Sequence, residues 1–217
     1  LQAARILQDI LEKKHFLGEA KAAFSDNAPQ DNAFINMLVL TAMRHLVFIR
    51  KILRRFVKKK LPAKAVFGEY ALILGTTESL YMNTPDYALI NSWVEITKKE
   101  TDKYVAGLVN AVLRKITAGK TELRQEDKGE FFPPEFFKLL AADYGSATAK
   151  QIQQAALSEP ALDITTAQNP QELARKLDGT LLPNGTVRLK NDGKIENLPD
   201  YEQGSWCCLL YTSDAAD

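Results

Sequence analysis

Cysteine is absent from this sequence until Cys207 and Cys208, two adjacent residues near the C-terminal end. Without spaced cysteines, the chain has no disulfide framework and no zinc site of the spaced-cysteine type. No stretch approaches the roughly 18 apolar residues that a membrane helix needs, and no charged-then-apolar signal segment opens the chain. We therefore predict a globular, cytoplasmic protein with no membrane partner and no bound metal.

Recognisable catalytic motifs are also missing. The sequence has no glycine-rich dinucleotide turn, no phosphate-binding P-loop and only two histidines, His15 and His45. We expect both histidines to lie in helices, with His45 on a polar face beside Arg44. We predict no catalytic, cofactor-binding or metal-binding residue in this chain.

The last residues have an unusual composition. Cys207 and Cys208 could be a redox pair, but the segment CLLYTSDAAD that begins at Cys208 can be back-translated into a common sequencing adapter. We therefore predict that residues 207–217 are adapter read-through, and that the natural sequence continues differently beyond Trp206. The chain begins at Leu1 within a helical pattern, so we also expect natural sequence before it.

The net charge is small, but charge is unevenly distributed along the chain. Residues 1–60 carry 12 Lys and Arg against 5 Asp and Glu, a balance of +7. Since the whole chain has a net charge of +1, the remainder carries −6. A basic first part indicates a polyanionic partner.

Residues 1–116 have a helical pattern almost throughout, with apolar residues three and four apart. Breaks at 25–32, 58–64 and 81–86 divide this region into five or six helices. The break before residue 86 predicts a helix with Thr84 as its N-cap and Pro85 in its first turn. We find no convincing strand here, so residues 1–118 are predicted to be an all-α domain.

The remaining sequence is more varied. Residues 119–132 are polar and are predicted to be a linker, and helices are expected over 134–145 and 147–157. Residues 162–166 are typical of a strand, and Asn169 caps a helix that starts at Pro170. Residues 186–198 predict a hairpin around an Asn-Asp-Gly turn. The fold class is thus mainly α, followed by a small α+β segment within 133–206.

The strongest chemical signal is the segment from Arg44 to Lys60, which contains eight Lys and Arg residues and no acid. At about 100° per residue, Ile49, Ile52, Leu53 and Phe56 share one face of a helix and the cations share the other. Like charges on one face repel each other, and contact with nucleic-acid phosphates would relieve this repulsion. The alternatives are a solvated face or an acidic membrane surface. The predicted nucleic-acid contacts are Arg5, Arg44, Arg50, Lys51, Arg54, Arg55, Lys58 and Lys59; Lys13 and Lys14 could extend them.

Several stretches resemble a known family. Residues 69–99 and the run AGLVNAVLRKI at 106–116 are similar to the NusB-like domain, through Leu74-Gly75, Leu80-Tyr81, Pro85 and VNAVLR. The continuation, with PPEFFKLLAADYG and LPDYEQGSW, resembles the RsmB/Sun family of bacterial 16S rRNA cytosine-5 methyltransferases. A stand-alone NusB-type transcription antitermination factor would end soon after residue 118.

This resemblance implies a NusB-like RNA-binding domain (1–118) and a helical connector with a small α+β RNA-binding segment (133–206). It further implies a methyltransferase domain that follows and uses S-adenosylmethionine and a cysteine thiolate. The cysteine motifs and the cofactor's glycine loop are missing here. We therefore expect 16S rRNA and the missing domain as partners, no bound cofactor and no activity from this chain alone. The alternatives are an antitermination-type RNA-binding module without enzymatic activity, and a helical bundle that binds only proteins.

Asn110 and Arg114 interrupt the apolar pattern of the run VAGLVNAVLRKI on one helical face, together with Lys103 and Gly107. A solvated stripe is the simplest interpretation. Gly within a helix, which costs about 1 kcal/mol relative to Ala, indicates a packing reason instead. We favour a polar seam against a neighbouring helix or the missing catalytic domain, in which Asn110 bonds across and Arg114 pairs with a carboxylate. Direct RNA contact is the third possibility.

Overall fold

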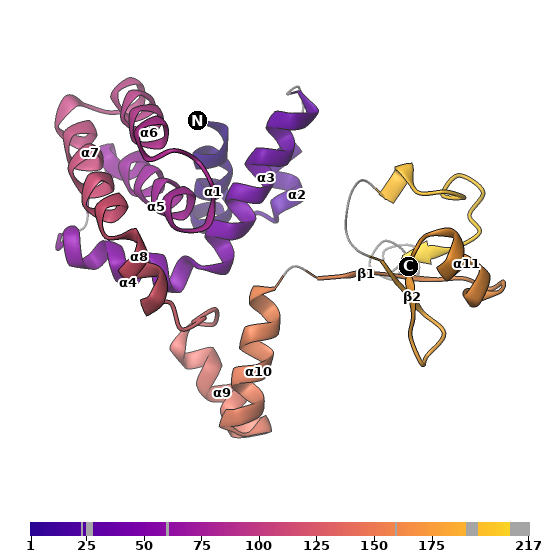
Figure 1. Ribbon diagram of the computed structural model, residues 1–217. Coiled ribbons are helices and arrows are strands. Elements are labelled where there is room, and N and C mark those ends of the chain that lie inside the picture. Colours follow the sequence, from indigo (N-terminus) through magenta and orange to yellow (C-terminus); the bar gives the residue numbers. More distant parts are fainter. Residues whose placement is uncertain (23, 25–27, 60, 159, 190–194, 209–217) are drawn as a thin grey trace. The chain divides into compact units, whose positions relative to one another are not determined.

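The structure, a computed structural model, describes residues 1–22, 24, 28–59, 61–158, 160–189 and 195–208 of the chain. The chain forms two compact units, one spanning Leu1–Leu157 and a second that begins at Ser158. The first unit is helical, and the second holds a small antiparallel sheet with one α-helix (Figure 1). This confirms the predicted fold class.

Helix α5 is the centre of the helical unit. Nearly every residue from Phe67 to Leu80 is buried, because other helices surround α5; its first part is mainly apolar, and the polar residues 76–79 are also buried. It packs against α1, α3, α4, α6, α7 and α8. The helices up to residue 118 are α1 (Gln2–Lys13), α2 (Leu17–Ala22), α3 (Pro29–Arg44), α4 (Leu46–Phe56), α5 (Val66–Tyr81), α6 (Asp86–Glu100) and α7 (Lys103–Ala118), with the 3-10 turn η1 (Ala63–Ala65) before α5.

The sequence predicted that the basic segment continues through His45 as one helix, and this prediction is wrong. Helix α3 ends at Arg44, α4 begins at Leu46, and the chain turns by 78° between them. The turn lets α4 lay Phe48, Ile49 and Ile52 into the core against α5. Helix α4 ends at Phe56, so Lys58 and Lys59 lie beyond it. Among the described residues, no single helix is long and apolar enough to cross a membrane; only this bent pair reaches the required length and composition.

The predicted positions of both histidines and of one helix cap are also wrong. His15 follows the end of α1, and His45 is the residue at which the chain turns between α3 and α4. Helix α6 begins at Asp86 with Pro85 as its N-cap, so Thr84 does not cap it. The next helix, α7, does have a side-chain cap: the Asp102 carboxylate accepts a hydrogen bond from the Val105 amide at 2.9 Å.

The segment predicted to be a linker contains helix α8 (Lys120–Glu126). Leu123 is buried against the core, and the Lys120 ammonium bonds to Asp86 at the start of α6 at 2.8 Å. Residues 120–126 therefore belong to the bundle. A hairpin of α9 (Pro134–Tyr144) and α10 (Ser146–Leu157) follows within the same compact unit, with Gly145 at φ 79° between them. This confirms both predicted helices.

The second unit contains a sheet with strand order β2-β3-β1-β4, in which all pairs are antiparallel. Asn169 caps its helix as predicted, since its side chain accepts from the amides of Gln171 and Glu172. The predicted hairpin is wrong: Val187–Leu189 pairs with β1 and β2, and Ile195–Asn197 is a 3-10 turn (η2), while residues 190–194 lie outside the described residues. The elements are β1 (Leu162–Thr165), α11 (Pro170–Lys176), β2 (Thr180–Leu181), β3 (Val187–Leu189) and β4 (Cys207–Cys208).

Candidate nucleic-acid interface

Four of the predicted RNA-binding cations line one groove. Arg50 and Arg54 are one helical turn apart on α4, and Lys58 and Lys59 follow where the chain leaves the helix. The groove has a volume of about 470 Å³, and its floor is apolar, made by Leu53, Val57, Leu61, Leu72 and Ile73. Glu69 is the acid that lines it, so the lining carries four positive charges against one negative charge. We name this the arginine groove.

The other edge of α4 is neutralised within the protein. Lys51 bonds to Glu130 at 3.2 Å, and Arg55 makes a two-pronged contact with Glu126 at 3.2 and 2.5 Å. This hydrogen bond from Arg55 lowers the pKa of the Glu126 carboxyl below its ordinary value. Because residues four apart share a helix edge, α4 presents Arg50 and Arg54 on one edge and Lys51 and Arg55 on the other. The structure thus divides the predicted cationic face into a groove and an ion-paired edge.

The two remaining predicted cations lie outside this groove. Arg5 on α1 pairs with Glu100 at the end of α6, and its guanidinium carbon lies 5.8 Å from the centre of the Phe67 ring. Arg44 is the last residue of α3. Neither residue lines the arginine groove, so the structure does not join them to the other cations in one site. Their role in RNA binding stays a prediction.

Asn110 and Arg114 do not form a seam within the helical unit. The Arg114 Nε–H donates to the Asn110 side-chain oxygen at 3.1 Å, one turn back along the same helix. Gly107 has nothing within 4 Å of the position that a Cβ would take, so no neighbouring helix in the described residues requires a glycine there. Residues 103, 107, 111 and 114 are exposed on α7. A seam against a further domain stays a prediction.

Sequence reasoning missed a partly buried polar cluster beside α4. His45 stacks on Tyr81 with ring centres 3.8 Å apart, and His45 Nδ1 and the Tyr81 hydroxyl both bond to one oxygen of Asp127, at 2.9 and 2.5 Å. Burial acts to raise the pKa of Asp127, but the hydrogen bonds from His45, Tyr81 and the Gly129 amide outweigh it and lower that pKa. Burial raises the pKa of Tyr81 far above its ordinary value, as does the bond to Asp127. These three residues are 36 and 46 positions apart, and no local sequence pattern links them.

The described residues form no recognisable site for the cofactor that the resemblance implies. Nucleotide-type cofactors bind at the carboxyl ends of parallel strands beside a glycine-rich turn. Here the sheet is antiparallel, and its strands are two to four residues long. Among the described residues, no three His, Cys, Asp or Glu side chains are grouped to hold a metal. Cys207 and Cys208 form β4, and the origin predicted for residues 207–217 stays a prediction.

These observations define a class of fold: a helical bundle around a buried central helix, with a cationic groove on one side. Residues 1–118 match the NusB family, and the chain belongs to that family. The similarity predicted from the run VNAVLR and its neighbours is therefore confirmed for the helical domain.

Three curated relatives extend the similarity beyond the NusB domain, and each is named ribosomal RNA small subunit methyltransferase B. The protein of Xanthomonas campestris pv. campestris is 26% identical, over 94% of this chain and 49% of its own length. The protein of Vibrio vulnificus is 22% identical, over 93% of this chain and 51% of its own length. The protein of Vibrio cholerae is 26% identical, over 65% of this chain and 34% of its own length. These matches confirm the predicted resemblance. The chain spans about half the length of the two relatives that match most of it.

A solved structure, that of PH0851, has a similar fold. It superposes with a TM-score of 0.57 over 95% of this chain and 52% of its own, at 14% sequence identity. At that identity the match supports the fold alone.

Proposed function

We propose that this chain is the RNA-binding part of an S-adenosylmethionine-dependent methyltransferase that modifies cytosine in 16S rRNA in the cytoplasm. The observation that carries the proposal is the arginine groove, in which Arg50, Arg54, Lys58 and Lys59 surround an apolar floor with one acid among them. Phosphate contacts from Arg and Lys supply most of the affinity of such interfaces. The similarity of the chain to methyltransferases of small-subunit rRNA supports rRNA as the nucleic acid.

The chemistry of methylation is assigned to residues outside the described chain. Transfer of a methyl group to C5 of cytosine needs an activated cysteine thiolate and a base freed from its stack. Among the described residues, the cysteines are the adjacent pair Cys207 and Cys208, and no Pro-Cys or Thr-Cys motif occurs in the sequence. We therefore propose that the chain positions the RNA and that the chain alone does not methylate it.

A salt-dependent RNA-binding titration tests the proposal. The double substitution Arg50→Gln with Arg54→Gln removes two charges from the arginine groove without reversing any. We expect weaker binding to an rRNA fragment and a slope of log affinity against log salt that is shallower by about 1.4 to 1.8, since each contact with phosphate contributes about 0.7 to 0.9.

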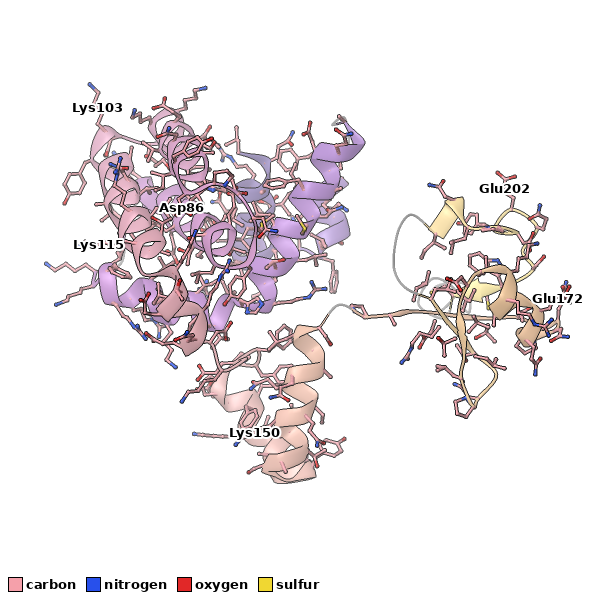
Figure 2. All side chains as sticks on the ribbon, viewed as in Figure 1. Asp86, Lys103, Lys115, Lys150, Glu172 and Glu202 are labelled. Carbon is pink, nitrogen blue, oxygen red and sulfur yellow. The ribbon has the colours of Figure 1, made fainter. Side chains whose placement is uncertain are left out.

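The control removes the same charge elsewhere. Lys99 and Lys103 are exposed at the end of α6 and the start of α7 (Lys103 is labelled in Figure 2) and do not line the groove. The double substitution Lys99→Gln with Lys103→Gln should leave the slope nearly unchanged. Equal slopes for both double variants would contradict the proposal, because net charge alone would then explain the binding.

A second candidate function is an antitermination-type RNA-binding module without enzymatic activity, which the NusB family match over residues 1–118 favours. The similarity to methyltransferases over 94% of the chain favours the first candidate, because it continues through residues that a lone NusB domain lacks. Joining the chain to the methyltransferase domain of a relative and assaying methyl transfer to 16S rRNA would separate them. No turnover with intact RNA binding would favour the module.

A further inference from the structure

A second groove lies beside α4, separate from the arginine groove, and all of its lining residues except Val47 lie beyond the NusB match. It has a volume of about 560 Å³ and lies between Val47 in the first turn of α4, the chain around residues 128–134, and the α9–α10 hairpin. Its apolar surface is aromatic and aliphatic, with Phe132, Phe137, Pro134 and Val47. We name it the lysine groove because of the charges around it.

Three lysines from three different elements surround this groove: Lys128 follows α8, Lys138 lies on α9 and Lys150 lies on α10. All three are exposed, and none forms an ion pair with another described residue (Lys150 is labelled in Figure 2). Glu130 is the acid that lines the groove, and it already bonds to Lys51 on α4 at 3.2 and 3.3 Å. The groove is therefore positive, with cations that lack an internal partner.

The walls of the lysine groove are held in place by the surrounding structure. The Phe132 amide donates to the Gln153 side-chain oxygen of α10 at 3.1 Å, and the Phe132 ring meets Phe136 edge to face at 5.0 Å. Asp127, one residue before Lys128, is anchored by His45 and Tyr81. An aromatic ring in a fixed position can stack on a base without losing much conformational freedom.

The lysine groove also continues the cationic face of α4. Arg54 lies seven residues after Val47, and at 100° per residue it points within about 20° of the same direction. A strand that contacts Arg54 in the arginine groove can therefore run along this face of α4 toward Val47. Along this face Lys51 is paired with Glu130, and the lysine groove then offers its three lysines, three positive charges against the one carboxylate of Glu130.

We propose that the lysine groove binds an unpaired nucleotide of the same RNA, with its base against Phe132 and Phe137 and its phosphate near Lys128, Lys138 and Lys150. The proposal rests on the proposed function and specifies that the RNA is single-stranded at this point. Cations around an aromatic surface are the combination by which proteins hold single strands. A base paired in a duplex has no free face to offer Phe132.

Two variants of the full chain test the proposal. Binding is measured to two probes: a short oligouridylate, which is single-stranded, and a blunt-ended RNA duplex. The variant Lys138→Gln with Lys150→Gln changes two exposed side chains. The slope of log affinity against log salt for oligouridylate should become shallower by about 1.4, because each lost phosphate contact on a single strand removes about 0.7. The variant Phe132→Leu should weaken oligouridylate binding by about fivefold or more and leave duplex binding unchanged.

The outcomes separate this proposal from the proposed function. If Arg50→Gln with Arg54→Gln weakens RNA binding while both lysine-groove variants bind oligouridylate like the unmodified chain, the nucleotide site is overturned and the RNA-binding function stands. If none of these variants changes RNA binding, the RNA-binding function itself fails. Equal losses for single strand and duplex in the lysine variant, with no effect of Phe132→Leu, would show a phosphate contact without a base and would also overturn the site. Melting curves by circular dichroism check that each variant is folded.

Discussion

At the scale of single residues, two glycines in neighbouring helices have opposite surroundings. A Cβ on Gly75 in α5 would lie 2.9 Å from both terminal methyl groups of Leu113 and 3.2 Å from Trp93. A Cβ on Gly107 in α7 would meet nothing within 4 Å. The same atom therefore has opposite effects at the two sites.

We expect Gly75→Ala to lower the free energy of unfolding by about 1–3 kcal/mol, because the packed core must shift to accept the methyl group. Gly107→Ala should raise it by about 0.5–1 kcal/mol, because Ala restricts the unfolded chain and favours the helix. Urea denaturation followed by circular dichroism measures both. Destabilisation by Gly107→Ala would indicate a close contact at α7 that the described residues do not contain.

Asp127 makes stability depend on acid pH. Its pKa is lowered from the ordinary value of 3.8, so its ionised form stabilises the folded state at higher pH. That contribution is fully present well above pH 3.8 and is lost as the pH falls through the lower pKa of the folded protein. Asp127→Asn should therefore be less stable than the unmodified chain by about 1–3 kcal/mol at neutral pH.

The difference between Asp127→Asn and the unmodified chain should shrink as the pH falls below about 4. Urea denaturation at a series of pH values measures it. The control is Asp143→Asn, an exposed carboxyl on α9. A gap between Asp127→Asn and the unmodified chain that stays constant down to pH 2 would contradict the role of the ionised carboxylate.

At the scale of elements, the cap of α7 and the start of α6 provide a matched pair. Asp102→Ala removes the hydrogen bond to the Val105 amide and should cost about 1 kcal/mol of stability. Thr84→Ala, at a residue that does not cap α6, should change stability by less than about 0.5 kcal/mol. Thermal unfolding by calorimetry distinguishes the two variants. A larger loss of stability in Thr84→Ala would indicate that Thr84 does cap α6, as the sequence predicted.

The division of the basic segment is also a property of the elements. Apolar and cationic residues alternate in a helical pattern from residue 44 up to the break predicted at 58–64, and that pattern predicts one helix without a turn at His45. Packing overrides it at His45, because the chain must turn by 78° to lay α4 against α5. Ion pairing then divides the cations, since Glu126 and Glu130, more than 70 residues away in the chain, reach only one edge of α4.

At the scale of the whole molecule, the two compact units have separate cores. The buried cluster of the helical unit lies within residues 3–123, and that of the sheet unit lies within residues 164–208. Each unit contains one of the two tryptophans, Trp93 in the first and Trp206 in the second. Indole N–H signals in an NMR spectrum can therefore report the two units separately.

We expect Ile164→Ala to lower the stability of the sheet unit by about 2–5 kcal/mol, because Ile164 is fully buried at its centre. The Trp206 indole signal should then disappear at a lower urea concentration than in the unmodified chain. The Trp93 signal should disappear at an unchanged concentration, because no residue of the helical core is altered. A parallel shift of both signals would mean that the two units unfold together.

The sequence by itself determined the helical class of the first unit, the α9–α10 hairpin, the Asn169 cap and the family resemblance. These features follow from local periodicity, from Pro and Gly at helix ends, and from residue order. It also located the cations on α4, because charge is visible in any sequence. Only the tertiary structure decided which cations are available, since pairing of Lys51 and Arg55 depends on carboxylates that packing brings near.

The same reason explains what sequence reasoning missed. The cluster joins His45 before α4, Tyr81 at the end of α5 and Asp127 after α8, and the lysine groove joins residues of α4, α9 and α10. Residues so far apart in the sequence come together only through packing. The Asn110–Arg114 pair shows the converse: its spacing suggested a partner across a seam, and within the helical unit Arg114 donates to Asn110 on the same helix. Local pattern defines which side chains share a helical face, and only packing decides what that face meets.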